Sequence, residues 1–314
     1  MAQNFPVRPR YRVLIDNDFG GDPDGLIQLA HHLLSPTVEV VGIIVSHLRK
    51  EDTWAMGSSG IEPGIREVER ILELTGMKVP IFRGSDDPML DLNTPVESNG
   101  VDFIIDEINR KSDLPLFIVC GGSLTQVASA YLRKPETFSN VIVIWIGGSE
   151  YSDIGITTPD APLLEYNTHE DVLAAQVIFN QSQIKLWQVP RNTYRQALVS
   201  FAELDVRLKR SGKLGEYLYE KLASTVNWWD QKNRLLGETY CFGDSALVLL
   251  TALHTPYEPD QASSSYVDLN APFLGIDGGY IKNPNGRKIR VYTTLDTRLL
   301  FEDFFAKLKI LESK

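Results

Sequence analysis

Short apolar runs and longer amphipathic stretches alternate along the whole chain. The apolar runs are rich in Val and Ile and carry few polar residues between them. Such runs are typical of strands that are buried on both faces of a parallel sheet. They predict strands at residues 13–15, 38–46, 79–83, 116–120, 141–146, 184–189 and 287–294.

In the amphipathic stretches, apolar residues recur at the spacing of three and four that indicates a helix. These stretches predict helices over residues 26–34, 63–75, 101–110, 124–132, 170–179, 201–229, 244–253 and 297–308. Gly212 and Gly215 predict a break within the long helical stretch. We expect loops over residues 47–60 and 159–167 and irregular structure over residues 254–272.

The regular alternation of strand and helix predicts the fold class. It favours an α/β, Rossmann-like fold with a mostly parallel sheet and helices on both faces. The chain has no internal repeat, no low-complexity linker and no break in composition. We therefore expect one domain over residues 1–314.

Composition narrows the range of functions. The net charge is −10, which disfavours non-specific binding to nucleic acid or to anionic membranes. No apolar run reaches the length that spans a membrane, and the two cysteines indicate no disulfide framework. The N-terminus lacks the core of a signal peptide, so we expect a cytoplasmic protein, or a secreted or periplasmic one if a signal peptide was removed.

The first predicted strand ends in a cluster of acidic side chains. Asp16, Asn17 and Asp18 follow its apolar residues directly, and Asp22 and Asp24 precede the first predicted helix. Loops at the carboxyl ends of strands are where α/β proteins form sites. Four carboxylates within nine residues repel each other and are costly to bury. A hard divalent cation with oxygen ligands relieves that cost, so the stretch predicts a metal-binding loop.

A simpler interpretation of this loop stays open. Asp16 or Asp22 can cap the helix or close an Asx turn, and the whole cluster can be a solvated acidic loop. The position directly after a core strand favours a site.

Four stretches together resemble one known family. Residues 16–25 are similar to an aspartate-rich loop of the type DTDxGxDDA, and residues 122–126 (Gly-Ser-Leu-Thr-Gln) are similar to GPLTN. Residues 165–167 (Glu-Tyr-Asn) are similar to EFN, and Asp244 opens an apolar helix near the C-terminus. In this order, the stretches resemble those of the inosine-uridine-preferring nucleoside hydrolase family. The resemblance rests on the whole set, because each stretch alone is a weak signal.

The resemblance implies a calcium-dependent N-ribohydrolase that acts on a nucleoside or a related riboside. Ca²⁺ would hold the nucleophilic water and the ribose 2′- and 3′-hydroxyls, and Asp18 would bind the ion and accept the proton of the water. The other ligands implied are Asp24, the backbone carbonyl of Thr125, and Asp244. We add Asp22 as a candidate ligand.

The resemblance also implies contacts with the sugar from Glu165 and Asn167. Asp24, Asn17 and His47 complete the candidate substrate-binding residues. Carboxylates suit this chemistry because breaking a glycosidic bond builds positive charge on the sugar. The resemblance further implies a homo-oligomer, either a dimer or a tetramer.

The chain departs from the family pattern at three places. The second aspartate of the DD pair is Gly25 here, and the loop is two residues longer. Residues 46–49 (Ser-His-Leu-Arg) stand where the family often has Asn. Gly243 stands where many members have His, so we expect little acid catalysis for a purine or pyrimidine leaving group.

Two other functions stay open. The first is a haloacid-dehalogenase-like phosphatase, with Asp16 as nucleophile and Asp18 as acid. The second is a calcium-dependent sugar- or nucleoside-binding protein without catalysis, which Gly25 keeps possible.

Overall fold

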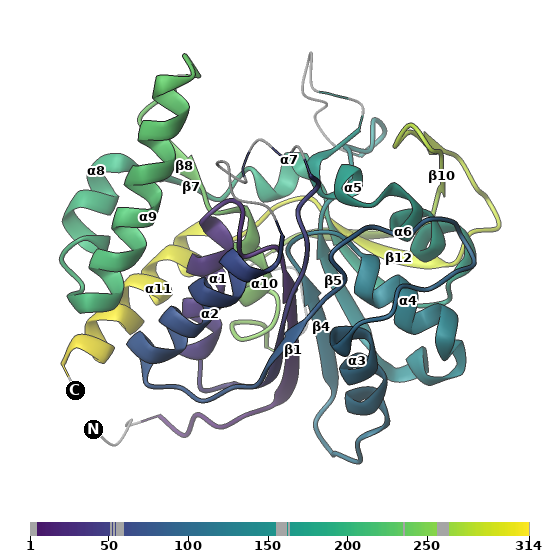
Figure 1. Ribbon diagram of the computed structural model, residues 1–314, viewed down its shortest axis with the longest axis horizontal. Helices are drawn as coiled ribbons and strands as arrows, with labels where there is room; N and C mark the ends of the chain where they lie inside the picture. The colour runs from purple at the N-terminus through teal and green to yellow at the C-terminus, as the bar shows by residue number, and fades with distance from the viewer. Residues whose placement is uncertain are drawn as a thin grey trace.

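The centre of the molecule is an eight-stranded sheet in the order β3-β2-β1-β4-β5-β6-β12-β9 (Figure 1). The computed structural model describes residues 5–50, 52, 54, 60–154, 162, 164–234, 236–255 and 264–313. All neighbouring strands are parallel except β9, which pairs antiparallel with β12. The strands are β1 (Tyr11–Asn17), β2 (Val38–Val45), β3 (Ile81–Arg83), β4 (Leu116–Cys120), β5 (Ile142–Ile146), β6 (Lys185–Val189), β9 (Tyr266–Asn270) and β12 (Lys288–Tyr292).

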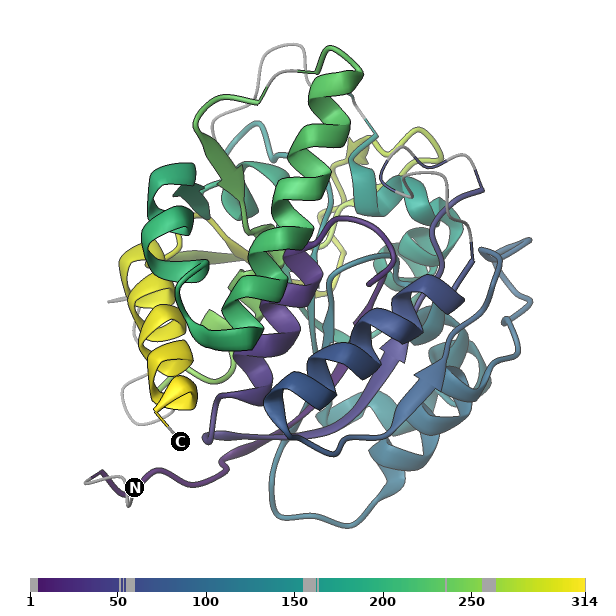
Figure 2. The ribbon, with the colours of Figure 1, turned by 60° about the vertical axis from the view of Figure 1, so that its left-hand side comes forward.

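Helices cover both faces of this sheet, which confirms the predicted fold class. One face packs against α1 (Asp24–Leu33), α2 (Glu62–Thr75), α9 (Gly212–Gln231), α10 (Ala246–Leu249) and α11 (Thr297–Glu312). The other face packs against α3 (Asn99–Asn109), α4 (Thr125–Arg133) and α6 (Val172–Gln176). Figure 2 turns the first face forward and shows α9 and α11 side by side.

The central strand β1 contributes to both cores by simple alternation. Val13 and Ile15 lie in the core of the first face, and Leu14 lies in the core of the second. All three side chains have no exposed surface. Alternate residues of a strand point to opposite faces, so a continuous apolar run is what a strand between two helix layers requires.

Short elements connect the layers. They comprise α5 (Tyr166–Glu170), α7 (Arg191–Tyr194), α8 (Phe201–Glu203), the 3₁₀ turns η1 (Pro135–Asn140) and η4 (Gly243–Ser245), and the π-helical turns η2 (Val177–Gln181) and η3 (Leu204–Leu208). Two small antiparallel pairs are β7 (Leu198–Ser200) with β8 (Thr239–Cys241), and β10 (Phe273–Leu274) with β11 (Tyr280–Ile281). Within the described residues, no helix is long and apolar enough to cross a bilayer.

The structure differs from the predicted elements in several places, and the short elements α5, α7, β7, β8, β10 and β11 were not predicted. Strand β9 lies within the stretch expected to be irregular, because this edge strand is half-exposed and lacks a continuous apolar run. The helix expected over residues 244–253 consists of the turn η4 followed by the single short helix α10. The break predicted within the long helical stretch is found at Gly212, where α9 begins after α8 and η3, whereas Gly215 lies inside α9. Parts of the predicted loops 47–60 and 159–167, and of residues 254–272, lie outside the described residues.

The order of the strands fixes where a ligand is expected to bind. The chain adds β2 and β3 on one side of β1 and then places β4 on the other side. The sheet therefore has a topological switch point between β1 and β4, and α/β proteins bind ligands at the carboxyl ends of such strands. The acidic loop that begins at Asp18 follows β1 at this point, and Gly121 follows β4.

Candidate active site

A cavity of about 510 Å³ opens at the carboxyl ends of β1 and β4, and we call it the acidic cavity. Several carboxylates and aromatic rings lie in its wall. The lining includes Asp18, Asp22, Asp24, Asp244, Trp54, Tyr166, Tyr194, Tyr240, Asn167 and Arg195. Its volume suits a small molecule, and the concentration of carboxylates suits a ligand that is neutral or carries positive charge.

Asp18 is the carboxylate that directly follows β1. Its side chain lines the acidic cavity although the residue is only 8% exposed. Burial raises the pKa of Asp18 well above its usual range, and the nearby carboxylates of Glu170, Asp244 and Asp52 raise it further. A carboxylate with a raised pKa is a stronger base near neutral pH than an ordinary aspartate.

The loops before α1 and before α10 meet across the acidic cavity. The backbone N–H of Asp244 donates to Oδ2 of Asp24 at 3.1 Å, and the Tyr240 hydroxyl donates to Oδ1 of Asp22 at 2.7 Å. Burial raises the pKa of Asp22 to about 6 and that of Asp244 to about 7. Burial also raises the pKa of Asp24, and Asp22 and Asp244 add to the effect. Segments far apart in the sequence thus form one cluster of carboxylates that are costly to ionise together.

Asp16 and Asn17 lie beneath the acidic cavity and are not part of its lining. Asp16 is 1% exposed, and Oδ1 accepts a hydrogen bond from the Ser46 hydroxyl. Burial raises the pKa of Asp16 to about 7. Asn17 has no exposed surface, and its amide Nδ2 donates to Oδ2 of Asp244 at 2.8 Å. The nucleophile of the phosphatase hypothesis, Asp16, is therefore not presented to a ligand in this cavity.

Glu165 is fully buried and acts as the N-cap of α5. Its Oε2 accepts from the backbone N–H of Gly148 at 2.8 Å and of Thr168 at 3.0 Å. Its Oε1 accepts from the Tyr194 hydroxyl at 2.9 Å. The structure thus places this predicted sugar contact behind the cavity wall, where both oxygens are already hydrogen-bonded.

Asn167 lines the acidic cavity, as expected for a residue that contacts substrate. Its Nδ2 donates to the carbonyls of Gly121 at 2.8 Å and of Ile146 at 2.7 Å. Both donor hydrogens therefore bind the ends of β4 and β5. These bonds fix the amide, and its oxygen is not used by them.

Thr125 and His47 lie outside the acidic cavity. Thr125 begins α4, is fully buried, and donates its hydroxyl to Oδ2 of Asp171 at 2.7 Å. His47 is also fully buried, and burial lowers its pKa. The structure therefore brings Asp18, Asp22, Asp24, Asp244 and Asn167 together, and separates Thr125, His47, Glu165 and Asn17 from the cavity surface.

A network of charged residues beside the acidic cavity was not expected from the sequence. Arg49 pairs with Glu170 (Nε to Oε1, 2.7 Å) and with Asp52 (2.7 Å). The Tyr166 hydroxyl donates to Oδ1 of Asp52 at 2.8 Å. Tyr166 could have been noticed, because it stands between two residues of the predicted site. No local pattern reveals that Arg49 pairs with Glu170, since the two residues are 121 positions apart.

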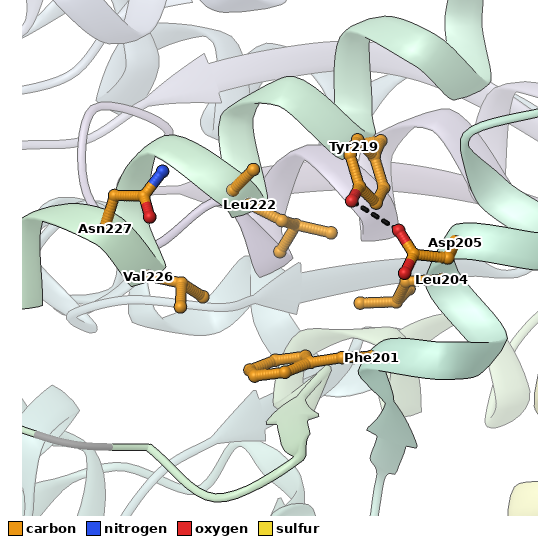
Figure 3. A pocket seen from close by; sticks show the side chains of 8 residues that line it. Phe201, Leu204, Asp205, Tyr219, Leu222, Val226 and Asn227 are labelled. Carbon is orange, nitrogen blue, oxygen red and sulfur yellow. Dashed lines mark hydrogen bonds between the residues drawn. The ribbon is translucent and has the colours of Figure 1, made fainter. Parts of the chain in front are cut away.

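A second cavity of about 260 Å³ lies between α9 and the segment formed by α8 and η3 (Figure 3). Its lining is mostly apolar. The single carboxylate in that lining, Asp205, accepts a hydrogen bond from the Tyr219 hydroxyl. This cavity shares no lining residue with the acidic cavity. Catalytic groups are gathered in the acidic cavity, which is therefore the candidate active site.

An α/β sheet with a cavity of convergent carboxylates at its switch point is typical of proteins that bind or transform small molecules. The model of one protein family, described as inosine-uridine preferring nucleoside hydrolase, matches residues 13–296. This chain belongs to that family.

Individual relatives are distant. The chain is 26% identical over 210 residues to a protein of Schizosaccharomyces pombe described as uncharacterized, and 24% identical over 202 residues to the inosine-uridine preferring nucleoside hydrolase of Crithidia fasciculata. These matches cover 59% and 57% of this chain. The chain spans 62% and 58% of the length of these curated relatives.

The fold is shared over nearly the whole chain. A solved plant nucleoside hydrolase superposes with a TM-score of 0.73 at 19% identity, covering 96% of this chain and 99% of that one. At this identity the likeness shows the fold alone.

The family is typically calcium-dependent, and the residues of the acidic cavity offer the oxygen donors that calcium prefers. Their arrangement, however, is not that of a metal centre. Within the described part of the chain, no three His, Cys, Asp or Glu side chains are grouped so that they could hold one metal ion. Asp24 accepts from the backbone of Asp244, and Asp244 accepts from the amide of Asn17. The residues present, as arranged, do not fit a calcium ion.

Proposed function

We propose that this chain is a hydrolase that cleaves the N-glycosidic bond of a nucleoside or a related riboside in the acidic cavity. The observation that carries the proposal is the position of Asp18: a nearly buried carboxylate with a raised pKa, at the switch point of a nucleoside hydrolase fold. Family membership supports the reaction class. The divergence of the chain leaves the identity of the riboside open to experiment.

In the proposed reaction, Asp18 accepts a proton from water on one of its carboxylate oxygens, and the water attacks the anomeric carbon. The bond between the sugar and the base breaks as positive charge builds on the sugar, and its electron pair stays with the base, which leaves as an anion. The negative cavity around Asp24 and Asp244 stabilises this charge. We assign Asn167 to hydrogen-bond the sugar, because it is the polar amide of the cavity wall.

The mechanism assigns no step to calcium, because within the described residues no three acidic, His or Cys side chains are grouped so that they could hold one ion. The predicted ligands are Asp18, Asp22, Asp24, Thr125 and Asp244. A bound divalent cation would supply a Lewis acid that lowers the pKa of its water. The homo-oligomer and the cytoplasmic location remain predictions of the sequence.

The test is turnover of inosine, uridine and 4-nitrophenyl riboside by the wild type and by Asp18→Asn. Asparagine keeps the size of the side chain but cannot accept a proton, so we expect kcat to fall by about 10²–10⁴, the usual contribution of a general base. Asp205→Asn, a carboxylate of the second cavity, is the matched control and should retain activity. Far-UV circular dichroism verifies that both variants are folded. An Asp18→Asn variant within tenfold of the wild type would show that Asp18 is not the base.

Two features favour a second function, which is binding of a riboside without catalysis. Gly25 replaces an aspartate of the family loop, and the amide of Asn17 binds Asp244 instead. These features favour a protein that binds a riboside without cleaving it. Calorimetric binding of inosine by the wild type, with no release of the base over hours, would support this function and reject the first.

A further inference from the structure

Gly25 faces directly into the carboxylate cluster. A Cβ atom built on this glycine would lie 3.4 Å from Oδ2 of Asp244 and 3.0 Å from Nδ2 of Asn17. Gly25 is not among the residues with positive φ, so its backbone accepts an ordinary side chain. A side chain at this position would therefore begin in contact with both Asp244 and the amide of Asn17.

Hydrogen bonds fix the orientation of the Asn17 amide. Its Oδ1 accepts from the backbone N–H of Asp18 at 2.8 Å, so the other end of the amide must be Nδ2. Nδ2 donates to Oε1 of Gln28 at 3.3 Å and to Oδ2 of Asp244 at 2.8 Å. Gln28 is fixed in turn, because its Nε2 donates to Nδ1 of His32.

The packing around Asn17 leaves little freedom for another arrangement. A Cβ on Gly121 would lie only 2.3 Å from Nδ2, so a glycine is required there for the amide to fit. The Asn17 side chain has no exposed surface. One N–H group of Asn17 therefore points permanently to Asp244 in the carboxylate cluster, and the other is held by Gln28.

We propose that the Asn17 amide replaces a metal ion as the partner of Asp244, so that this chain binds calcium only weakly. We further propose that a carboxylate at position 25, combined with a smaller residue at position 17, creates a calcium site. The N–H groups of an amide repel a cation, and the site has one carboxylate fewer than a loop with aspartate at position 25. Calcium affinity rises with the number of charged ligands and with their convergence. The inference concerns the cavity of the proposed function but does not depend on turnover.

The experiment is a calorimetric titration of the EDTA-treated protein with calcium chloride. The wild type is compared with Gly25→Asp and with the double variant Asn17→Ser/Gly25→Asp. Serine lacks the amide that a Cβ at position 25 would contact. The matched control is Asn17→Ser/Gly25→Asn, which has the same shape at position 25 without the charge.

We expect a dissociation constant of about 1 mM or weaker for the wild type, and binding about 100-fold tighter for the double variant, consistent with the range that ligand charge produces in proteins. The control should bind as weakly as the wild type. Adding Asp244→Asn to the double variant should abolish the gain, because Asp244 is then no longer a charged ligand. Gly25→Asp alone should gain less calcium affinity than the double variant, because the amide of Asn17 obstructs the new side chain at position 25.

Two results would overturn the proposal. One is a wild type that binds calcium with a dissociation constant of about 10 μM or tighter, in the range of calcium sensors. The other is a double variant that binds no more tightly than its Asn17→Ser/Gly25→Asn control. If the double variant is unfolded without calcium, refolding on addition of 10 mM calcium, about tenfold above the weak-binding limit, supports the proposal, and failure to refold rejects it. Because the readout is binding, a wild type with no hydrolase activity leaves the inference intact.

Discussion

Three tyrosines of the acidic cavity each donate the hydroxyl proton to a carboxylate. Tyr166 donates to Asp52 at 2.8 Å, Tyr194 to Glu165 at 2.9 Å and Tyr240 to Asp22 at 2.7 Å. A hydroxyl has a single proton, so these groups are poorly placed to protonate a departing base. Among the described lining residues there is no histidine, and the guanidinium of Arg195 does not release a proton near neutral pH. In the proposed reaction, these tyrosines and Arg195 therefore give the leaving group little acid assistance.

This predicts that the chain prefers a substrate whose leaving group is stable as an anion. We expect kcat/KM for 4-nitrophenyl riboside to exceed that for inosine and uridine by about 10²–10⁴, the usual contribution of a general acid. Steady-state assays of the three substrates measure the ratio. Tyr240→Phe is the control, and it should leave the ratio unchanged. Equal rates on inosine and nitrophenyl riboside would reveal an acid that this cavity does not display.

At the scale of residues, the structure brings together the carboxylates that the sequence singled out, and it places several other predicted site residues away from the cavity surface. Asp18, Asp24 and Asp244 line the cavity because the strand and loop order alone brings them there. Glu165 and Asn17 turn away because bonds with distant residues fix them. Such bonds depend on the packing of several elements at once and leave no pattern in the local sequence.

At the scale of elements, α1 and α11 meet through an acid-sensitive contact. His31 of α1 is fully buried and lies 2.7 Å from Oδ2 of Asp303 on α11, which also binds Lys307. Burial lowers the pKa of His31 to about 4, and this effect outweighs the opposite effect of Asp303. Lys307 lowers the pKa further. The folded protein therefore holds His31 neutral under conditions in which an exposed histidine is protonated.

This contact predicts a loss of stability in mild acid. Between pH 6.5 and about 4 the unfolded chain binds a proton at His31 that the folded chain does not, so the free energy of unfolding falls as the pH falls. The difference of about 2.5 pKa units corresponds to about 3 kcal/mol. Urea denaturation of the wild type and of His31→Gln at pH 7 and pH 4.5 measures it. Glutamine keeps a donor toward Asp303 but does not titrate, and an equal decrease in both proteins would contradict the prediction.

The two glycines of the long helical stretch have different structural roles, which the sequence alone does not distinguish. Gly212 begins α9 with φ at +65°, a conformation that favours glycine. Gly215 lies within α9, where a Cβ would stand 2.2 Å from the carbonyl oxygen of Leu208. The sequence indicated a break at both glycines. Only the structure shows that the second one serves the close approach of η3 to α9.

At the scale of the whole molecule, the central strand joins the two cores. β1 pairs with β2 and β4 and contributes buried side chains to both faces of the sheet. The candidate site also joins remote parts of the chain, since Asn17 and Asp244 are 227 positions apart. The alternating pattern of the sequence predicted the layers of this architecture, because continuous apolar runs are typical of strands buried between two layers of helices.

The sequence-based prediction of a single domain over residues 1–314 can be tested by scanning calorimetry. Because β1 is shared by both cores, we expect one unfolding transition, with a ratio of calorimetric to van't Hoff enthalpy of about 1. The control is a sample that has been truncated by limited proteolysis before heating. Two resolved transitions would show that the halves of the sheet unfold independently.

The short distance between Gly25 and Asn17 also constrains how this chain can evolve. An aspartate gained first at position 25 meets the amide of Asn17 at 3.0 Å and strains the packing around it. A smaller residue gained first at position 17 leaves Asp244 without its amide donor and leaves a gap beside Gly25. Either order passes through an intermediate whose packing is worse than that of both ends, so the effect of each substitution on stability depends on the residue at the other position. A substitution at one of the two positions is therefore disfavoured while the other is unchanged. We expect natural variation that changes one residue at a time to keep Asn17 and Gly25 together.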